Sequence, residues 1–202
     1  MIKNVIFDFG QVLVRFDPEY MCRAFINDDG DVDLLSSVLF DRKYWDRLDA
    51  GTIKDEELIK DAKGRMPERL HEVAEKIYYN WLYNLPEIEG MREVIALCKE
   101  MGFGVYLLSN ISEYFAERYT EIPILSLIDG FVFSAVAKAV KPSEEIFSHI
   151  CQKFNLTPSE TLFVDDNEMN INGALKFGIV SYLFDGDSKA LYNYIKQTQL
   201  TN

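Results

Sequence analysis

The stretch NVIFDFGQVLV, residues 4–14, is an apolar run that contains one carboxylate, Asp8, and one glycine, Gly10. The residues before Asp8 are apolar enough for a strand that is buried on both faces, as in a parallel sheet. An aspartate at the end of such a strand either shapes a turn or takes part in chemistry. Residues found elsewhere in the chain decide between these two roles.

From Gly90 onward, segments with strand character alternate with segments of helical periodicity. This alternation predicts βαβ units and a parallel sheet, of which residues 4–9 form the first strand. The other predicted strands are residues 104–110, 130–134, 161–166 and 178–184, and the predicted helices are residues 91–101, 112–118, 143–154, 168–177 and 188–197.

Residues from about 15 to 86 have a different pattern, with much charge, many aromatic residues and no convincing strand. Apolar side chains such as Phe25, Trp45 and Trp81 recur at helical spacings in this region. We therefore predict an all-helical unit that is inserted directly after the first strand of the sheet.

The composition limits the class of protein and its partners. With 202 residues, of which 48% are hydrophobic, the chain has enough apolar material for one domain, or for one domain with an insertion. Its net charge of −12 would repel nucleic acid and anionic membranes, so neither is an expected partner. The three cysteines show no pairing pattern, and no apolar run reaches the length of a membrane span. We expect a cytoplasmic protein without disulfides.

Polar residues stand at or after the ends of four predicted strands. In parallel α/β sheets, ligands bind outside the carboxyl ends of the strands. Taken singly, each residue would be interpreted as a turn, a helix cap or solvated surface. Together they occupy one class of position and combine acidic, basic and hydroxyl groups, which favours a functional site. They are Asp8, Ser109-Asn110, Lys141-Pro142 and Asp165-Asp166.

Four sequence motifs, in this order, resemble those of the haloacid dehalogenase (HAD) superfamily of hydrolases. They are FDFGQVL at 7–13, LLSN at 107–110, KP at 141–142 and FVDDNEMNINGA at 163–174. The resemblance covers nearly the whole chain. It implies an α/β fold in which a Rossmann-like core with a parallel sheet, residues 1–14 and 87–202, carries an inserted all-helical cap, residues 15–86.

The resemblance also implies a nucleophile and a metal site. Asp8 would attack phosphorus and form an aspartyl-phosphate that water then hydrolyses. One Mg²⁺ would neutralise charge in a site that holds both a carboxylate and a phosphate. Its ligands would be the carboxylates of Asp8, Asp165 and Asp166 and the backbone carbonyl of Gly10.

Other matching positions would bind the phosphate group of the substrate. Ser109 and Asn110, with backbone amides at a helix N-terminus, would receive phosphate oxygens. Lys141 would offset the remaining negative charge and take part in catalysis by lowering the basicity of the nucleophile. Asn170 would support the metal site without binding the ion. The substrate that this arrangement implies is a small phosphorylated metabolite.

Gly10 departs from the pattern of many HAD phosphatases, which place a second aspartate two residues after the nucleophile. In those relatives that aspartate protonates the leaving oxygen and then activates water, a contribution of about 10²–10⁴ in rate. One interpretation is an active phosphatase for leaving groups that need little protonation, such as glycosyl, acyl or aryl phosphates. In its Asp-x-Gly-x-Val motif the chain resembles a branch of sugar-phosphate phosphatases that includes proteins acting on glucose 1-phosphate.

Two other interpretations stay open. A metal-independent 2-haloacid dehalogenase also lacks the second aspartate, because halide leaves without a proton. It would leave the adjacent carboxylates of Asp165 and Asp166 unexplained, since unpaired like charges raise each other's pKa and destabilise a loop. The third interpretation is a non-catalytic protein that binds a phosphorylated metabolite. Assays of phosphate release and of halide release distinguish the three.

Two further regions are candidates for completing the site. Asp17 is close enough in sequence to serve as a surrogate acid, although an Asp-Pro pair also favours a helix N-cap. The segment DRKYWDRLDAG, residues 41–51, is the candidate for substrate contacts from the cap, through Arg42, Lys43, Tyr44, Trp45 or Arg47. We predict Mg²⁺-dependent hydrolysis of a small phosphomonoester by a monomer or homodimer.

Overall fold

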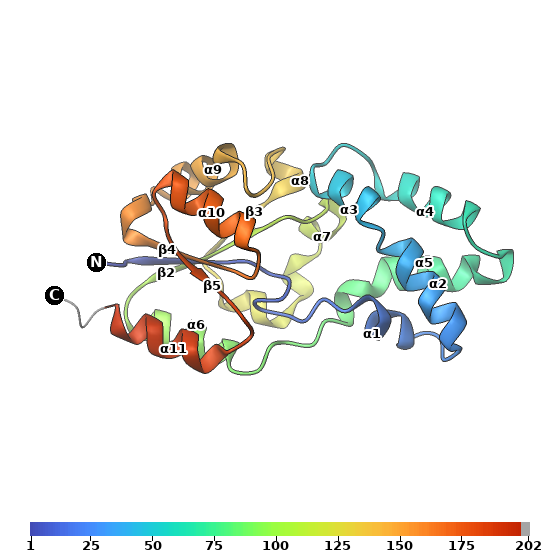
Figure 1. The fold of residues 1–202 in the computed structure, drawn as a ribbon, viewed down its shortest axis with the longest axis horizontal. Helices are drawn as coiled ribbons and strands as arrows, with labels where there is room; N and C mark the ends of the chain where they lie inside the picture. The colour runs from blue at the N-terminus through green and yellow to red at the C-terminus, as the bar shows by residue number, and fades with distance from the viewer. Residues whose placement is uncertain (199–202) are drawn as a thin grey trace.

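A five-stranded parallel sheet forms the centre of the larger unit (Figure 1). The structure is a computed structural model of the chain and describes residues 1–198. Its strands are β1 (Asn4–Phe7), β2 (Gly104–Ser109), β3 (Gly130–Phe133), β4 (Thr161–Asp165) and β5 (Val180–Leu183). They lie in the order β3-β2-β1-β4-β5. The predicted parallel sheet is confirmed, and each predicted strand overlaps an observed one.

The chain changes direction across the sheet at β1, which pairs with β2 on one side and with β4 on the other. Phe7, the last residue of β1, pairs with Leu107 of β2 and Val164 of β4. In open α/β sheets, ligands bind outside the carboxyl ends of the strands at such a switch point. The residues that follow β1, β2 and β4 are therefore brought to one rim of the sheet.

Helices cover both faces of the sheet, because successive side chains along a strand point to opposite faces. One face carries α6 (Met91–Glu100) and α11 (Ser188–Gln197), and the other carries α9 (Glu144–Phe154) and α10 (Glu168–Phe177) (Figure 1). Val5 and Phe7 pack into one buried cluster, and Ile6 between them packs into the other. All three side chains are fully buried.

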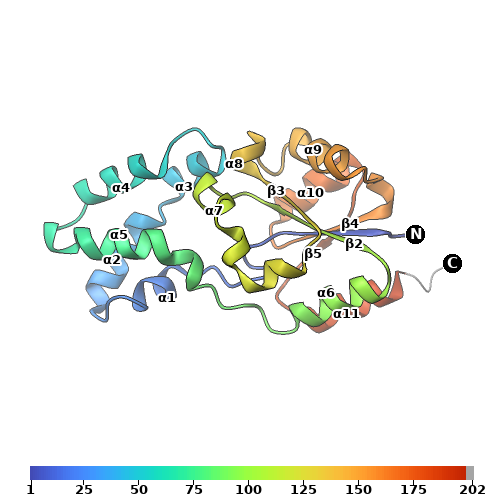
Figure 2. The ribbon, with the colours of Figure 1, turned by 180° about the vertical axis from the view of Figure 1, so that it is seen from behind.

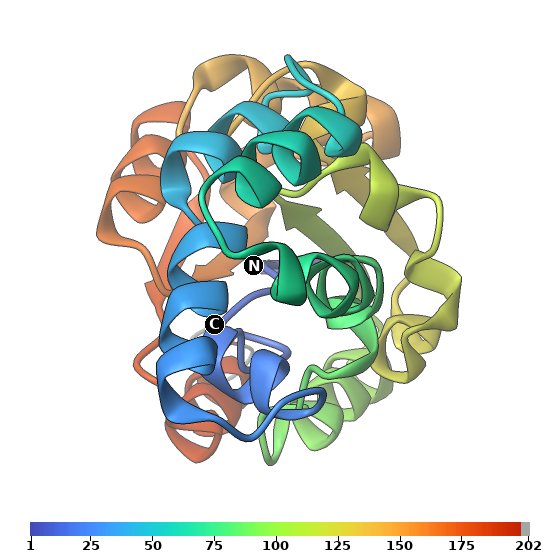
Figure 3. The same ribbon diagram turned by 90° about the vertical axis from the view of Figure 1, so that its right-hand side faces the viewer.

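The helical unit follows β1 in the sequence and lies beyond the carboxyl ends of the strands (Figures 1 and 3). Residues 15–86 contain no strand, which confirms the predicted all-helical insertion. Its elements are α1 (Pro18–Arg23), α2 (Asp29–Leu39), α3 (Arg42–Asp49), α4 (Asp55–Gly64) and α5 (His71–Asn80), with the 3-10 turns η1 (Glu68–Leu70) and η2 (Trp81–Tyr83).

The chain crosses between the two units twice, and the two crossings lie side by side. The Arg15 N–H donates a hydrogen bond of 2.8 Å to the Pro86 carbonyl, and the Ile88 N–H donates one of 3.0 Å to the Leu13 carbonyl. The predicted domain boundaries, after residue 14 and after residue 86, fall at this paired crossing. The division into two domains at these boundaries stays a prediction.

Short elements at the rim differ from the prediction. The helix expected over residues 112–118 is a single turn, α7 (Glu113–Ala116), because the backbone leaves the helical region at Arg118. Ser134, expected at the end of a strand, begins the four-residue helix α8 (Ser134–Ala137), which Figure 2 shows beside α7. The remaining 3-10 turns are η3 (Tyr119–Glu121), η4 (Pro123–Leu127) and η5 (Pro158–Glu160). Within residues 1–198, no helix has both the length and the apolar character needed to cross a membrane.

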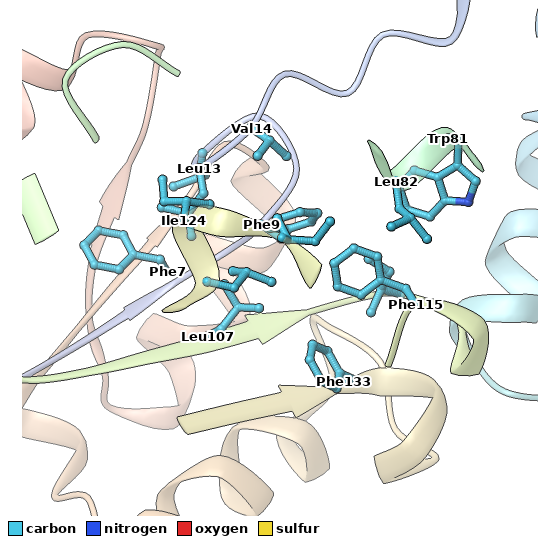
Figure 4. Packing of buried hydrophobic residues seen from close by; sticks show 14 of the residues in the cluster. Phe7, Phe9, Leu13, Val14, Trp81, Leu82, Leu107, Phe115, Ile124 and Phe133 are labelled. Carbon is cyan, nitrogen blue, oxygen red and sulfur yellow. The ribbon is translucent and has the colours of Figure 1, made fainter. Parts of the chain in front are cut away.

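A single apolar core continues from the sheet into the helical unit. Phe9, just after β1, packs against Phe115 of α7 with ring centroids 4.9 Å apart, and Phe115 stacks on Trp81 at 5.7 Å (Figure 4). All three rings are buried. Burial of large aromatic side chains is the main favourable term that holds such units together. The helical unit is therefore packed against the rim rather than tethered loosely to it.

Candidate active site

Asp8 stands where β1 leaves the sheet. Its N–H still donates to the Val164 carbonyl of β4 at 2.9 Å, so its backbone position is set by the sheet. Its own Oδ1 accepts a hydrogen bond of 2.7 Å from the Phe9 N–H. The side chain is only 13% exposed. The carboxylate is therefore held in one orientation at the rim that the strand order makes available.

Lys141 connects the ends of β1 and β4. Its Nζ lies 2.8 Å from Asp8 Oδ1 and 2.6 Å from Asp165 Oδ2, and its side chain is 1% exposed. Asn110 orients this lysine, because its side-chain oxygen accepts from the Lys141 N–H at 2.8 Å and its Nδ2 donates to the Lys141 carbonyl at 3.1 Å. The Asn110 side chain thus holds Lys141, and only its backbone is left for the phosphate contact predicted for this residue.

Asp165, at the end of β4, is fully buried and surrounded by donors. Besides Lys141, it accepts from the Asn167 N–H at 2.8 Å. Asn170 Nδ2, in the first turn of α10, lies 3.0 and 3.1 Å from its two carboxylate oxygens. The structure therefore places Asn170 against a predicted metal ligand, as expected for a residue that supports the site.

Carboxylate oxygens of Asp8, Asp165 and Asp166 lie within 4.8 Å of one another. Three carboxylates around one ammonium group leave an excess of negative charge, and hard oxygen donors are the ligands that Mg²⁺ prefers. Gly10, the fourth predicted ligand, lines the same cavity as Asp8 and Asp166. The donor set fits a magnesium ion by its chemistry and its clustering.

Burial has the largest effect on the pKa of Asp8. It raises the pKa of this carboxyl to about 7; the Lys141 ammonium opposes the rise and the nearby Asp165 carboxylate adds to it. Burial also disfavours the charged form of Lys141, but the two carboxylates outweigh it and raise the pKa of the ammonium. A divalent cation beside Asp8 would favour its ionised form, which is the form that a nucleophile needs.

A cavity of about 520 Å³ lies between this rim and the helical unit. Its size is that of a typical small-molecule site. Ser109, the buried last residue of β2, lines it together with Lys141. The lining from the helical unit consists of Phe16, Phe40, Arg42, Trp45, Asp46, Asp49 and Trp81.

The wall from the helical unit is aromatic with a few charges. The rings of Phe16, Trp45 and Trp81 pack edge to face at centroid distances between 5.3 and 5.7 Å. Arg42 pairs with Asp46 at 2.8 Å. Of the five residues predicted to contact substrate from segment 41–51, Arg42 and Trp45 line the cavity, whereas Lys43, Tyr44 and Arg47 are not part of the lining.

Asp49 is one of the cavity residues that the sequence analysis did not single out. It is the last residue of α3 and only 6% exposed. One signal could have found it, because a carboxylate in the last turn of a helix opposes the helix dipole and is disfavoured there without a compensating reason. In segment 41–51, the sequence analysis singled out the basic and aromatic side chains and did not name Asp49.

Asp17 has the structural role that its position before a proline predicts. Its side chain accepts a hydrogen bond of 3.0 Å from the Tyr20 N–H and caps α1. It is not among the residues that line the cavity. The structure therefore shows the capping role of Asp17, which the sequence also predicted, and the role of surrogate acid stays a prediction.

Comparison with known proteins places these features in a family. The family model described as haloacid dehalogenase-like hydrolase matches residues 2–178. D-ribitol-5-phosphate phosphatase of Bacteroides thetaiotaomicron is 29% identical over 192 residues, which make up 90% of this chain and 91% of that protein.

Solved structures share the fold. An HAD family enzyme of Bacteroides thetaiotaomicron in complex with magnesium and inorganic phosphate aligns with a TM-score of 0.70 and 21% identity, over 93% of this chain and 96% of that chain. The L-2-haloacid dehalogenase of Xanthobacter autotrophicus aligns with a TM-score of 0.70 and 17% identity, over the full length of both chains. Because the two scores are equal, the fold alone does not choose between phosphate and halide chemistry.

Proposed function

The chain belongs to the haloacid dehalogenase-like hydrolases, and from this premise we propose that it is a Mg²⁺-dependent phosphatase acting on a small sugar or polyol phosphate. The observation that carries the proposal is the cluster of Asp8, Asp165 and Asp166 beside the buried Lys141 ammonium, next to a cavity of about 520 Å³. This arrangement joins a nucleophile to the charge compensation that a phosphate dianion requires.

The reaction would proceed through a covalent intermediate. An oxygen of Asp8 attacks phosphorus, the bond between phosphorus and the leaving oxygen breaks, and the phosphoryl group is carried on Asp8. Water then attacks phosphorus, the bond to Asp8 breaks, and inorganic phosphate is released. Ser109 and the neighbouring backbone amides orient the phosphoryl oxygens, while Lys141 offsets their charge.

Asp8, Asp165, Asp166 and the Gly10 carbonyl would hold Mg²⁺, which when bound stabilises the negative charge that develops on the transferring phosphoryl group. Asn170 and Asn110 act one step away, on Asp165 and Lys141 respectively. The magnesium and phosphate bound in the related Bacteroides structure support this assignment.

The wall from residues 15–86, which we propose to be a cap domain, supports a polyhydroxylated substrate. It offers the aromatic faces of Trp45 and Trp81 and the charged groups of Arg42, Asp46 and Asp49. Aromatic faces with carboxylate acceptors suit hydroxyl-bearing groups, and the surplus of negative charge disfavours a second phosphate or a carboxylate. The ribitol-phosphate phosphatase relative supports the same class. Glycosyl 1-phosphates are the members of this class whose leaving oxygen needs least protonation.

Dehalogenation is the competing function, and the charges of the site argue against it. A 2-haloacid is already an anion, and its carboxylate would enter a site where three carboxylates face one ammonium. Without a cation to offset them, the adjacent Asp165 and Asp166 repel each other and the substrate. A phosphatase that binds Mg²⁺ uses the same residues without this conflict.

Phosphate release from p-nitrophenyl phosphate, glucose 1-phosphate and ribitol 5-phosphate, measured with Mg²⁺ and with EDTA, tests the proposal. We expect turnover that requires Mg²⁺ and that disappears in Asp8→Asn. Halide release from 2-chloropropionate without metal would replace the proposal with a dehalogenase. If the protein releases neither phosphate nor halide, the proposal is wrong and the protein is a non-catalytic binding protein.

A further inference from the structure

The proposed phosphatase lacks a proton donor on its core side. Position 10, where many relatives carry the acid, is a glycine, and alkoxide leaving groups depart slowly unless they are protonated. A Cβ built at Gly10 would meet only Phe16 Cβ, at 3.9 Å, so the backbone does not demand glycine there. The site therefore has room for an acid at position 10 and does not use it.

Asp49 faces this site from the other wall of the cavity. It lies at the end of α3 and lines the cavity that Asp8 and Lys141 line from the core. Its side chain is 6% exposed, and among the described residues its Oδ1 is buried without any hydrogen-bond partner. A buried carboxylate oxygen without a partner is costly, so a protein that retains one has a reason for it.

Contacts with the core fix the position of Asp49. The Ser134 hydroxyl of α8 donates to the Asp49 carbonyl at 2.6 Å, and Lys138 Nζ donates to the Gly51 carbonyl at 3.1 Å. Gly51 itself has a φ of +62°, and a Cβ there would lie 2.6 Å from the Ala135 carbonyl oxygen. Figures 1 and 2 both show α3 beside α8. The backbone at Asp49 is thus anchored by the unit that holds the nucleophile, whereas the carboxylate itself is left without a partner at Oδ1.

The surroundings of Asp49 favour its protonated form near neutral pH. Burial raises the pKa of its carboxyl to about 7. Arg42 on its own helix and Lys141 from the core lower it, whereas Asp46 on its helix and Asp8 from the core raise it. A general acid works best when its pKa lies near the working pH. Asp49 is therefore able both to give and to take a proton under physiological conditions.

We propose that Asp49 is the general acid and base of this enzyme, supplied by the cap in place of the aspartate that Gly10 replaces. The inference rests on the proposed phosphatase function and adds a catalytic residue to it. In the first step the Asp49 carboxyl gives its proton to the leaving oxygen as the bond to phosphorus breaks. In the second step the Asp49 carboxylate takes a proton from the attacking water, and the bond between phosphorus and Asp8 breaks. Asp49 ends each cycle protonated, as it began.

The substitution Asp49→Asn tests this assignment, with substrates that differ in their need for a proton. The p-nitrophenolate group leaves as a stable anion, whereas ribitol 5-phosphate and glycerol 3-phosphate must release an alkoxide. We expect kcat/KM for the alkyl phosphates to fall about 10²–10⁴-fold more than kcat/KM for p-nitrophenyl phosphate. We also expect the basic limb of the pH profile for alkyl substrates to disappear. A purely structural role for Asp49 would lower both substrates equally, and a role in binding substrate hydroxyls would raise KM for the alkyl phosphates without removing the basic limb.

The double variant Gly10→Asp, Asp49→Asn asks whether an acid on the core side restores the reaction. We expect it to bring the ratio between aryl and alkyl substrates back to within about tenfold of the wild type, because the donor is returned from a different direction. Asp33→Asn is the control. Asp33 is an exposed residue of α2 that does not line the cavity, and we expect the substitution to change neither substrate.

The possible outcomes separate the inference from the function on which it rests. If the wild type releases no phosphate from any of these substrates, the proposed function fails, and the inference fails with it. If the wild type is active and Asp49→Asn leaves the aryl-to-alkyl ratio unchanged, Asp49 is not the acid and the phosphatase stands. A selective loss that Gly10→Asp repairs supports both.

Discussion

The two walls of the cavity treat charge in opposite ways. On the core wall, Lys141 is paired with Asp8 and Asp165, and Asn170 and the Asn167 N–H bind the remaining oxygens of Asp165. On the cap wall, formed by residues 15–86, the rings of Phe16, Trp45 and Trp81 line the cavity together with Asp49, whose Oδ1 has no partner among the described residues. Saturated hydrogen bonding fixes groups in place, whereas an unpaired buried group is costly. The core wall is thus the fixed part of the site, and the acid that we propose for the proton transfers lies on the cap wall.

The difference between the walls also has a thermodynamic side. The core network is stable because each buried charge has a partner of opposite sign, and it becomes costly when one partner is removed. On the cap wall, the unpaired buried carboxylate of Asp49 already lowers the free energy of unfolding of the wild type. Substitutions on the core wall should therefore destabilise the protein, whereas neutralising Asp49 on the cap wall should stabilise it.

The largest effect is expected at the nucleophile of the core wall. Asp8→Asn removes the attacking oxygen's charge, and we expect phosphate release to fall by a factor on the order of 10⁴–10⁶ with every substrate. Fold should be retained, which circular dichroism checks. If Asp8→Asn kept a tenth of the activity, the covalent route through Asp8 would be wrong.

Removing the shared cation should break the core wall. Lys141→Met leaves Asp8 and Asp165 as buried carboxylates without a counter-charge, and we expect a loss of about 3–5 kcal/mol in the free energy of unfolding. Urea denaturation in EDTA measures it, and Mg²⁺ should recover part of the loss by replacing the missing positive charge. Lys189→Met, an exposed lysine, is the control and should change stability little. Equal stability of the two variants would contradict the paired network.

Neutralising Asp49 should raise the free energy of unfolding, whereas Lys141→Met should lower it. The pKa of Asp49 is raised from an ordinary value of 3.8 to about 7, so its stabilising contribution is complete below pH 3.8 and is lost as the pH rises through 7. Asp49→Asn carries no such charge. We expect the variant to match the wild type in acid and to exceed it above pH 7 by a few kcal/mol at most. Urea denaturation between pH 4 and pH 8.5 gives the comparison, and a wild type that is the more stable at high pH would refute it.

The smallest effects are expected where the two walls are joined. Ser134→Ala removes the hydroxyl that donates to the Asp49 carbonyl at 2.6 Å and accepts from the Ile111 N–H at 2.9 Å. Two backbone groups then lose a partner, and we expect a cost of about 1–3 kcal/mol with a higher KM.

Lys138→Ala provides the exposed counterpart of the same junction. It removes an ion pair of 2.7 Å with Glu113, and we expect a cost of only about 0–1 kcal/mol, because solvent screens the pair. Thermal melting and steady-state kinetics on both variants make the comparison. Should Lys138→Ala prove the more damaging, the exposed pair rather than the buried hydroxyl would hold the cap to the core.

Most of the fold could be predicted because apolar periodicity, helix caps and turn residues all act between neighbours along the chain. The predicted helices at 168–177 and 188–197 coincide with α10 and α11, since caps and apolar stripes mark both ends. The helix predicted over residues 112–118 is only the single turn α7, and α8 was not predicted, because four residues are too few to show a period. The first residue of α8, Ser134, is also held by tertiary hydrogen bonds.

For the candidate site, Asp8, Ser109 and the acidic pair were predicted because each stands at the end of a strand that is visible in the pattern. Lys141 lies further from its strand, beyond α8, and was singled out through the family motif. The motifs gave no information on how Asn110 is used, since its bonds to Lys141 join residues 31 positions apart. They also pointed to Asp17, which proved to cap a helix, and not to Asp49.

By itself, then, the order of residues determined that a parallel sheet would form and that a helical segment would follow its first strand. It also placed acids and a hydroxyl at the strand ends, with a lysine further along the chain. Only the folded chain decided which cap residues reach the cavity and which acid stays unpaired. The physical reason is range, because periodicity and capping act between neighbours along the chain. The burial that raises the pKa of Asp49 comes from tertiary packing, and Asp8 and Lys141 act on it only after folding brings them near.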